Sequence, residues 1–296
     1  MALVLHLHKR NDVECTELAV VTAKFYNLNV GFVITFYYEM IKPKEQRKAA
    51  TNVVGIVKEP WELERMTRAG EITDEAYADA LSYLAERSGK VTELEVAKRI
   101  KDYFLSHDST EAFDTIVAFG EGSADIHHTP TNKALNASDL VMIDMGSKYD
   151  GYCMDMTRSF LYKPTKDRSG KYAPASAKKN EMLKDVLDSQ QAGLKEVYAG
   201  NAIRNVDLTP RNYLCSKGYE SIPHYVGHGV GTEIHEDPLV GPKTEGKLLE
   251  GMVITVEPGV YVKGIGGVRI EDTVVVTKDG FRKLTNSSYT PVLGKK

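Results

Sequence analysis

Hydrophobic and polar residues alternate with two different repeats along the chain, one typical of helices and one typical of strands. From Pro60 to about Arg87, apolar side chains recur three or four positions apart, which is the period of an amphipathic helix. Pro60 suits the first position of such a helix. Thr92 and Glu95 have the spacing of a capping box and are followed by a second apolar stripe. The sequence therefore predicts two successive helices in this region.

Strand patterns with a period of two follow these helices. Strands are predicted at Thr115–Phe119, Leu140–Gly146 and Tyr152–Phe160, and helices at Ser176–Tyr198 and Leu208–Lys217. The last quarter of the chain contains four more predicted strands: Tyr225–Val230, Val253–Val256, Val268–Val276 and Phe281–Leu284. The order of helix, helix and strands thus occurs twice, which indicates a duplicated α+β unit.

The N-terminal stretch has a weaker pattern. It contains a short alternating segment at Leu3–Leu7, a helix-like segment at Asp12–Tyr26 and a strand-like segment at Val30–Tyr38. We therefore divide the chain into a short N-terminal segment, residues 1–57, and a larger domain, residues 58–296.

Composition narrows the class of protein. Hydrophobic residues make up 42% and charged residues 27% of 296, as in ordinary soluble proteins. The net charge of −3 gives no basic surface for nucleic acid, and no apolar run is long enough to span a bilayer. Three scattered cysteines indicate a reducing compartment and no thiolate metal site. We expect a cytoplasmic protein without nucleic-acid or membrane partners.

Asp144 and Asp155 lie on the two predicted strands that flank Asp150-Gly151. A hairpin that turns at Tyr149-Asp150 places them directly opposite each other, whereas a turn at Asp150-Gly151 makes them diagonal neighbours on one face. Two carboxylates at such a distance repel each other unless a cation lies between them. Two solvated aspartates on an exposed strand are the simpler alternative.

A second hairpin carries two glutamates. A turn centred on Gly264 places Glu257 opposite Glu271, and His228 stands between glycines that leave its imidazole free to point into a cleft. Four carboxylates and one imidazole suit a dinuclear site for Mn²⁺, Co²⁺, Fe²⁺ or Zn²⁺ better than a structural zinc site. Taken singly, Glu271 could pair with Arg269 and His228 could be an ordinary core histidine.

Four segments that carry these residues resemble a known family. They are IDMGSKYDGYCMDMTRSF, GHGVGTEIHEDP, GMVITVEPGVY and VRIEDTVVVT, and they resemble the pita-bread metallopeptidases, the methionine aminopeptidase and prolidase superfamily. The likeness runs from about Val57 to Leu284 and is strongest to the Xaa-Pro aminopeptidase and prolidase branch. It implies the α+β pita-bread (creatinase/aminopeptidase-like) fold, with pseudo-twofold halves, a curved antiparallel sheet of about six strands and a reduced N-terminal segment. A homodimer is also implied.

The resemblance assigns metal ligands. Asp144 would bind one divalent ion and His228 the other, with Asp155 and Glu271 bridging them. Glu257 would complete the second ion's ligands and take a proton from the water that the two ions activate as nucleophile. The ions implied are manganese or cobalt, with zinc or iron as alternatives.

It also assigns residues on the substrate side. His127 and His235 would hydrogen-bond the scissile carbonyl or protonate the proline nitrogen, and Arg269 would orient the neighbouring carboxylates. The spacing to Asp144 favours His127 over His128.

One departure from the family bears on the substrate. Prolidases of this family typically use an arginine after the second histidine to bind the proline carboxylate. Here the loop Glu236–Gly251 has Leu239 and no arginine, and only Lys243 or Lys247 could substitute. We therefore expect an Xaa-Pro aminopeptidase that acts on peptides with proline at the second position. An Xaa-Pro dipeptidase (prolidase), a methionine aminopeptidase and a non-catalytic pita-bread binding protein are the alternatives.

Overall fold

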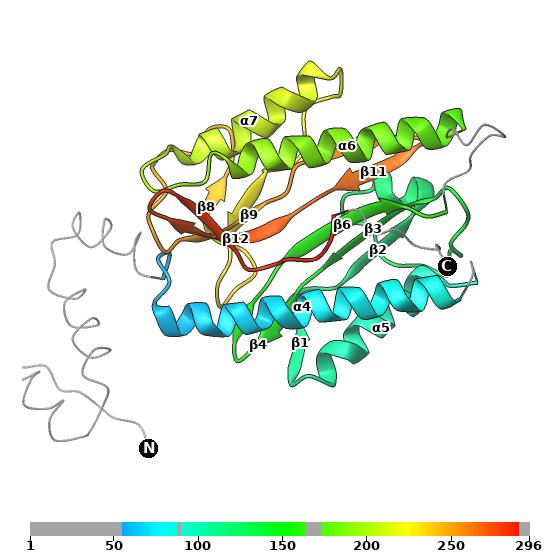
Figure 1. Cartoon of the computed structure of the whole chain (residues 1–296), viewed down its shortest axis with the longest axis horizontal. Coiled ribbons are helices and arrows are strands. Elements are labelled where there is room, and N and C mark those ends of the chain that lie inside the picture. The colour runs from blue at the N-terminus through cyan, green and yellow to red at the C-terminus, as the bar shows by residue number, and fades with distance from the viewer. Residues whose placement is uncertain (1–54, 88–89, 164–172, 290–296) are drawn as a thin grey trace, which may run out of the picture. The chain divides into compact units, whose positions relative to one another are not determined.

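The computed structural model describes residues 55–87, 90–163 and 173–289 (Figure 1). The segments predicted at Leu3–Leu7, Asp12–Tyr26 and Val30–Tyr38 lie outside the described residues. The division of the chain at residue 57 therefore stays a prediction.

The two helices predicted first are confirmed. Helix α4 spans Pro60–Glu86 and helix α5 spans Glu93–Leu105. Thr92 and Glu95 form the expected capping box, since the Thr92 N–H donates to Glu95 Oε2 at 2.8 Å and the Glu95 N–H donates to Thr92 Oγ1 at 3.3 Å. Both helices bury their apolar stripes against strands of the first half of the domain.

The first half contains two sheets with the strand orders β2-β3-β6 and β1-β4-β5. Asp144 faces Thr157, which makes it a diagonal neighbour of Asp155, and Asp150 and Gly151 both have positive φ, as a type I′ turn requires. The turn at Asp150-Gly151 is therefore confirmed and the directly opposed pairing is wrong. The elements are β1 (Ser109–Glu111), β2 (Ile116–Phe119), the 3₁₀ helix η1 (Gly120–Ala124), β3 (Leu140–Met145), β4 (Ser147–Tyr149), β5 (Tyr152–Cys153) and β6 (Met156–Leu161).

The second half contains a five-stranded sheet with the order β13-β12-β9-β7-β8 and a separate pair, β10-β11. The predicted strand Val268–Val276 is thus two strands, and β8 and β10 were not predicted. The elements are α6 (Pro174–Leu194), α7 (Ile203–Ser216), β7 (Gly227–Gly229), β8 (Glu236–Val240), β9 (Val253–Val256), β10 (Gly259–Val262), β11 (Gly266–Arg269), β12 (Asp272–Thr277) and β13 (Gly280–Lys283).

Helices cover the strands on two sides. Figure 1 shows α6 and α7 on one side and α4 and α5 on the other, with strands such as β3, β6, β9 and β12 between them. The order of two helices and several strands occurs twice, as predicted. The described strands form sheets of five, three, three and two strands rather than one sheet of about six.

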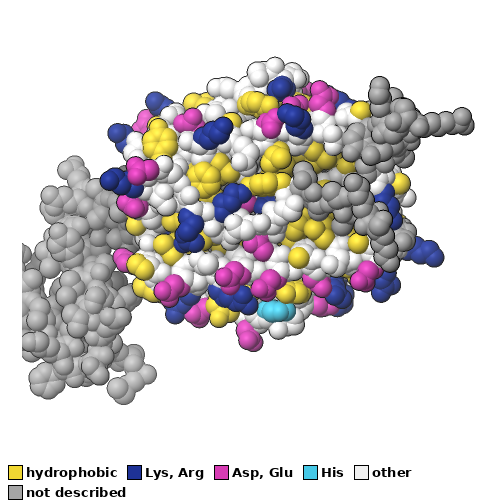
Figure 2. Space-filling model, viewed as in Figure 1, with side chains coloured by type: hydrophobic (Ala, Val, Ile, Leu, Met, Phe, Trp, Pro, Cys, Tyr) yellow, Lys and Arg dark blue, Asp and Glu magenta, His cyan; other side chains and the backbone are white. Residues whose placement is uncertain are grey.

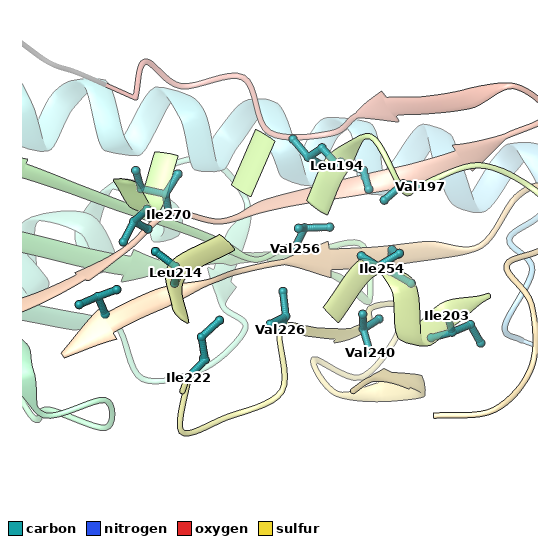
Figure 3. Close-up of a cluster of buried hydrophobic side chains, with 14 of the residues drawn as sticks. Leu194, Val197, Ile203, Leu214, Ile222, Val226, Val240, Ile254, Val256 and Ile270 are labelled. Carbon is teal, nitrogen blue, oxygen red and sulfur yellow. The ribbon is translucent and has the colours of Figure 1, made fainter. Parts of the chain in front are cut away.

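Apolar side chains fill the space under α6 and α7. Figure 3 shows Leu194 of α6 and Leu214 of α7 in a cluster with Ile254 and Val256 of β9. On the face seen in Figure 2, acidic and basic side chains are interspersed along α4. Among the described residues, none of the helices combines the length and apolar character that crossing a membrane requires.

Candidate metal centre

The first hairpin is interrupted where Asp155 lies. Strands β3 and β6 pair on one side of the interruption, and β4 and β5 pair on the other. Gly146 permits this, because a Cβ atom there would lie 1.8 Å from the Met154 carbonyl oxygen. Asp155 follows directly, just before β6, with only 5% of its surface exposed.

The second hairpin is interrupted at its two glutamates. Val256 faces Asp272 before the interruption and Gly259 faces Arg269 after it, so one register continues through both pairs of strands. Glu257 and Glu271 therefore lie across from each other, as predicted. Their backbone N–H groups donate elsewhere, to the Val226 carbonyl at 2.8 Å and to the Thr157 carbonyl at 3.0 Å.

One cavity of about 300 Å³ collects every site residue predicted from the sequence. Its volume is at the lower end of the range for ligand-binding cavities. The predicted residues that line it are Asp144, Asp155, His228, Glu257, Glu271, His127, His235 and Arg269.

Three of these residues form a compact donor group. Ligand atoms of Asp155, His228 and Glu271 all lie within 4.8 Å of one another. His228 Nε2 is 3.5 Å from Asp155 Oδ2 and 3.6 Å from Glu257 Oε1. His228 Nδ1 lies 3.0 Å from the Gly229 carbonyl oxygen, which can only accept a hydrogen bond, so the proton belongs on Nδ1 and the lone pair of Nε2 faces the carboxylates.

The carboxylates carry more negative charge than their surroundings compensate. Burial, followed by the charges of Asp144 and Glu257, raises the pKa of Asp155 well above its usual value. Burial and the charge of Asp155 do the same to the pKa of Glu271. Burial also raises the pKa of Glu257 to about 6, although His228 and Arg269 oppose this. This group of carboxylates therefore lacks a positive charge that would balance it.

Unpaired oxygen atoms point to the same conclusion. Within residues 55–87, 90–163 and 173–289, Asp144 Oδ1 and Glu271 Oε1 are buried without a hydrogen-bond partner. Buried oxygens of this kind are costly unless they coordinate an ion or are paired. Carboxylate oxygens together with one imidazole nitrogen are ligands that suit divalent transition metals, so the residues present fit the metal site that the sequence predicted.

Arg269 supports this group from one side. Its Nη2 lies 2.5 Å from Asp144 Oδ2, its Nη1 donates to Tyr261 at 2.9 Å, and its Nε donates to Thr157 Oγ1 at 3.2 Å. Thr157 in turn donates to Glu271 Oε2 at 2.6 Å. Arg269 therefore connects an aspartate of the first hairpin with a glutamate of the second.

This geometry agrees with a family comparison. A model of metallopeptidase family M24 matches residues 64–278, more than half of the 296-residue chain. The chain belongs to family M24. The resemblance to pita-bread metallopeptidases that four sequence segments suggested is thereby confirmed.

Individual M24 relatives cover most of this chain. An uncharacterised peptidase of Staphylococcus aureus (strain MRSA252) is 35% identical over 232 residues, which are 78% of this chain and 62% of the relative. The Xaa-Pro dipeptidase structure from Bacillus anthracis has 34% identity and a TM-score of 0.73, covering 80% of this chain and 64% of that one. The X-Pro aminopeptidase structure from Thermotoga maritima has 32% identity and a TM-score of 0.73, covering 81% and 65%. The chain thus spans less than two thirds of these M24 proteins.

Two residues of this M24 site were not predicted. His224 Nε2 lies 2.9 Å from the Tyr261 hydroxyl, which itself accepts from Arg269. Burial lowers the pKa of His224 to about 4 and raises the pKa of Tyr261 to about 12, so both are neutral at pH 7. No local pattern signals either residue, because their contact depends on the tertiary approach of two segments of the chain.

The loop that carries His127 is fixed by a buried carboxylate. Glu93 is fully buried at the start of α5 and accepts hydrogen bonds from the Phe119 N–H at 2.7 Å and the Thr131 N–H at 2.9 Å. His128 Nε2 lies 2.9 Å from the same side chain, so His128 is engaged there while His127 lines the cavity.

His235 lies on a segment fixed by a different carboxylate. Its neighbour Glu236 pairs with the buried Lys58 at 2.7 Å. The His235 ring packs edge-on against His228, with ring centres 4.4 Å apart. Burial and the adjacent His228 lower the pKa of His235.

Behind the carboxylates, a buried ion pair connects the two halves of the domain. Arg158 and Asp272 are both fully buried, with Arg158 Nη2 2.7 Å from Asp272 Oδ1. Arg158 Nη1 also donates to the Glu271 carbonyl, and Thr273 Oγ1 donates to the Asp155 carbonyl at 2.7 Å. These contacts fix the backbones of Asp155 and Glu271 relative to each other.

Proposed function

We propose that the protein is a metal-dependent peptidase that hydrolyses the Xaa-Pro bond at the N-terminus of peptides longer than two residues. The observation that carries this proposal is the cavity in which four acidic residues, His228 and three further histidines converge. Membership of family M24 supports the same reaction class.

The arrangement of ligands supports two ions. Asp155 and Glu271 would bind both, Asp144 would bind one, and His228 with Glu257 would bind the other. When bound, such ions supply a water of lowered pKa and polarise the scissile carbonyl. The remaining chemistry belongs to the protein's own side chains.

Glu257 is suited to accept a proton. Its carboxylate lines the cavity, with Oε1 3.6 Å from His228 Nε2, and a positioned carboxylate of this kind serves as a general base. His127 and His235 line the same cavity from two separate loops. They would hydrogen-bond the carbonyl oxygen of the scissile bond and deliver a proton to the proline nitrogen. That nitrogen is a tertiary amide without an N–H, so it leaves poorly unless it is protonated.

The lining of the cavity favours an aminopeptidase over a dipeptidase. Among the described residues that line it, Arg269 is the one Arg or Lys, and its guanidinium is already engaged by Asp144, Tyr261 and Thr157. A dipeptide would need a cation for its terminal carboxylate. Instead, Leu239 and Tyr225 line the cavity with 42% and 52% of their surfaces exposed.

A prolidase is the second candidate. The names of the Bacillus anthracis Xaa-Pro dipeptidase and the Pyrococcus furiosus prolidase favour it, the latter structure having 34% identity and a TM-score of 0.73. In that case Lys243 or Lys247 would have to reach the dipeptide carboxylate, although neither lines the cavity.

Hydrolysis of Ala-Pro-Ala beside Ala-Pro and Met-Ala-Ser, each with Mn²⁺ or Co²⁺ and with a chelator, tests the proposal. We expect metal-dependent cleavage of Ala-Pro-Ala above both other peptides. Preference for Ala-Pro would establish a prolidase, and preference for Met-Ala-Ser a methionine aminopeptidase. Glu257→Gln should lower kcat by about 10²- to 10⁴-fold, the usual contribution of a general base. Full turnover by a metal-loaded Glu257→Gln protein would contradict the role assigned to Glu257.

A further inference from the structure

A second cavity adjoins the first one. It has a volume of about 490 Å³ and is bounded by α5, the end of the first-half sheet and the loop that carries His127. Ile116 and His127 line both cavities. The two hollows therefore share a wall at the residue that we place beside the scissile bond. We call the second one the α5 cavity.

The walls of the α5 cavity suit an uncharged chain. Leu94, Ala97, Ile116 and Pro130 give it an apolar lining, and Leu94 is 44% exposed. An apolar side chain exposed in a concave surface is a feature of ligand sites.

The charged residues of the α5 cavity balance one another. Lys98 and Lys101 are offset by Glu111 and Asp114. Lys101 Nζ lies 2.6 Å from Glu111 Oε2, and Lys98 Nζ lies 2.6 Å from Asp102 Oδ2 on the same helix. With the cations paired in this way, the cavity is built for a neutral segment rather than for a free anion.

The wall between the cavities is held in place before any substrate binds. His128 lines the α5 cavity, and the buried Glu93 binds both His128 and Thr131. A preformed wall of this kind lowers the entropic cost of ordering a bound chain.

We propose that the α5 cavity binds the part of the peptide substrate that follows the proline. The inference rests on the proposed Xaa-Pro aminopeptidase function. Such an enzyme has one residue before the scissile bond, so a chain that continues out of the first cavity past His127 must be the C-terminal side of the substrate. At roughly 3.3–3.6 Å per extended residue, two or three residues after the proline would span on the order of 10 Å. The preferred substrates are therefore peptides of at least four or five residues with uncharged residues after the proline.

A length series of peptides tests this inference. The metal-loaded enzyme is assayed with Ala-Pro-Ala, Ala-Pro-Ala-Ala and Ala-Pro-Ala-Leu-Ala. We expect kcat/KM to rise by about 5- to 10-fold from the tripeptide to the pentapeptide, mainly through KM, because an added apolar contact improves binding by about this factor.

Two leucines on α5 provide a matched pair of variants. Leu94→Asp introduces a charge into the α5 cavity, whereas Leu105→Asp introduces the same charge at a leucine that does not line it and is 57% exposed. Leu94→Asp should remove most of the pentapeptide preference, and Leu105→Asp should retain it. Thermal unfolding of both variants checks that they fold.

The possible outcomes separate the two proposals. Cleavage of all three peptides with equal kcat/KM, or an equal loss of preference in both variants, would overturn the α5 cavity as a substrate site and leave the peptidase function intact. Cleavage of none of the peptides in the presence of metal would overturn the proposed function, and the inference with it.

Discussion

The two acid-bearing hairpins place their carboxylates in the cavity by different routes. In the first, Asp144 stays inside a paired strand opposite Thr157, and only Asp155 lies in the interruption. In the second, Glu257 and Glu271 both lie in the interruption, directly across from each other. The two acids of the first hairpin are thus diagonal neighbours, whereas those of the second lie opposite each other. The backbone N–H groups of Glu257 and Glu271 are therefore free to bind other elements.

This difference makes the second hairpin dependent on the first. The Glu271 N–H donates to the Thr157 carbonyl, and the Glu271 carboxylate accepts from the Thr157 hydroxyl. The cavity side of this junction carries uncompensated acids, whereas the far side carries the paired Arg158 and Asp272. The far side supplies its own cation, whereas on the cavity side Arg269 pairs with Asp144 and leaves Asp155, Glu257 and Glu271 without an arginine or lysine partner among the described residues.

The largest expected effect follows from removing one acid on the cavity side. Glu271→Gln should lower metal-dependent peptidase activity by at least about 100-fold, since even residues around metal ligands contribute 10- to 100-fold. In chelator, the same variant should be more stable to urea than wild type by about 1–3 kcal/mol, because one buried like charge is gone.

A matched control for this variant is Glu245→Gln, at an exposed glutamate. Glu245→Gln should change neither the metal-dependent peptidase activity nor the stability to urea. Mn²⁺ should raise the urea midpoint of wild type and of Glu245→Gln but not that of Glu271→Gln. A chelated Glu271→Gln protein less stable than wild type would show that the acids are compensated within the chain.

The next effect concerns the far side of the junction. Arg158→Met should destabilise the fold by about 3 kcal/mol, because it leaves Asp272 buried without its guanidinium partner. Lys283 and Tyr289 also contact Asp272, at 2.9 Å and 2.5 Å, and limit the loss. Arg68→Met removes an exposed pair with Glu71 and should cost less than 1 kcal/mol by the same urea titration. Equal losses in the two variants would contradict the distinction between buried and exposed pairs.

The cavity side could be predicted from sequence because hairpin register is local. The glycine-rich segment around Gly264 fixes one turn, so the opposition of Glu257 and Glu271 follows from counting along two strands. For Asp144 and Asp155 the sequence left two turns open, and the structure decides for the turn at Asp150-Gly151. The far side could not be predicted in this way. Arg158 and Asp272 are 114 positions apart, and nothing in either strand pattern indicates that they meet.

Some elements and their boundaries were predicted wrongly for related reasons. The predicted helix Leu208–Lys217 has Pro210 in its first turn, where proline is tolerated, whereas helix α7 begins at Ile203, five residues earlier, and has Pro210 in its interior. β8 was missed because its partner β7 supplies the pairing, whereas its own residues, EDPLV, include a proline and two acids that disfavour a strand. His224 was missed because its contact with Tyr261 depends on the tertiary approach of two segments.

A smaller effect is expected at the contact between the hairpins. Thr157→Val removes the hydroxyl that donates to Glu271 and accepts from Arg269, so metal affinity measured by calorimetry should fall by about 10- to 100-fold. Thr273→Val is the matched control, because its hydroxyl donates to the backbone carbonyl of Asp155 rather than to a carboxylate. It should weaken metal binding less. A larger loss of affinity in Thr273→Val would mean that backbone position, rather than carboxylate orientation, limits the site.

The smallest effect is a pH dependence that arises where His224 contacts Tyr261 of the second hairpin. Burial lowers the pKa of its partner His224 to about 4, below the value of about 6.5 for an unfolded histidine. Between these values the unfolded chain binds more protons than the folded one, so the contribution of His224 to stability falls as the pH falls. His224→Gln should remove about 1.5 kcal/mol of the loss in unfolding free energy between pH 6.5 and 5, measured by urea titration in chelator. At pH 7.5 the protonation of His224 contributes nothing, so any difference there reports packing alone. Parallel pH profiles for wild type and His224→Gln would show that His224 is protonated equally in both states, and the neutral His224–Tyr261 contact would have to be abandoned.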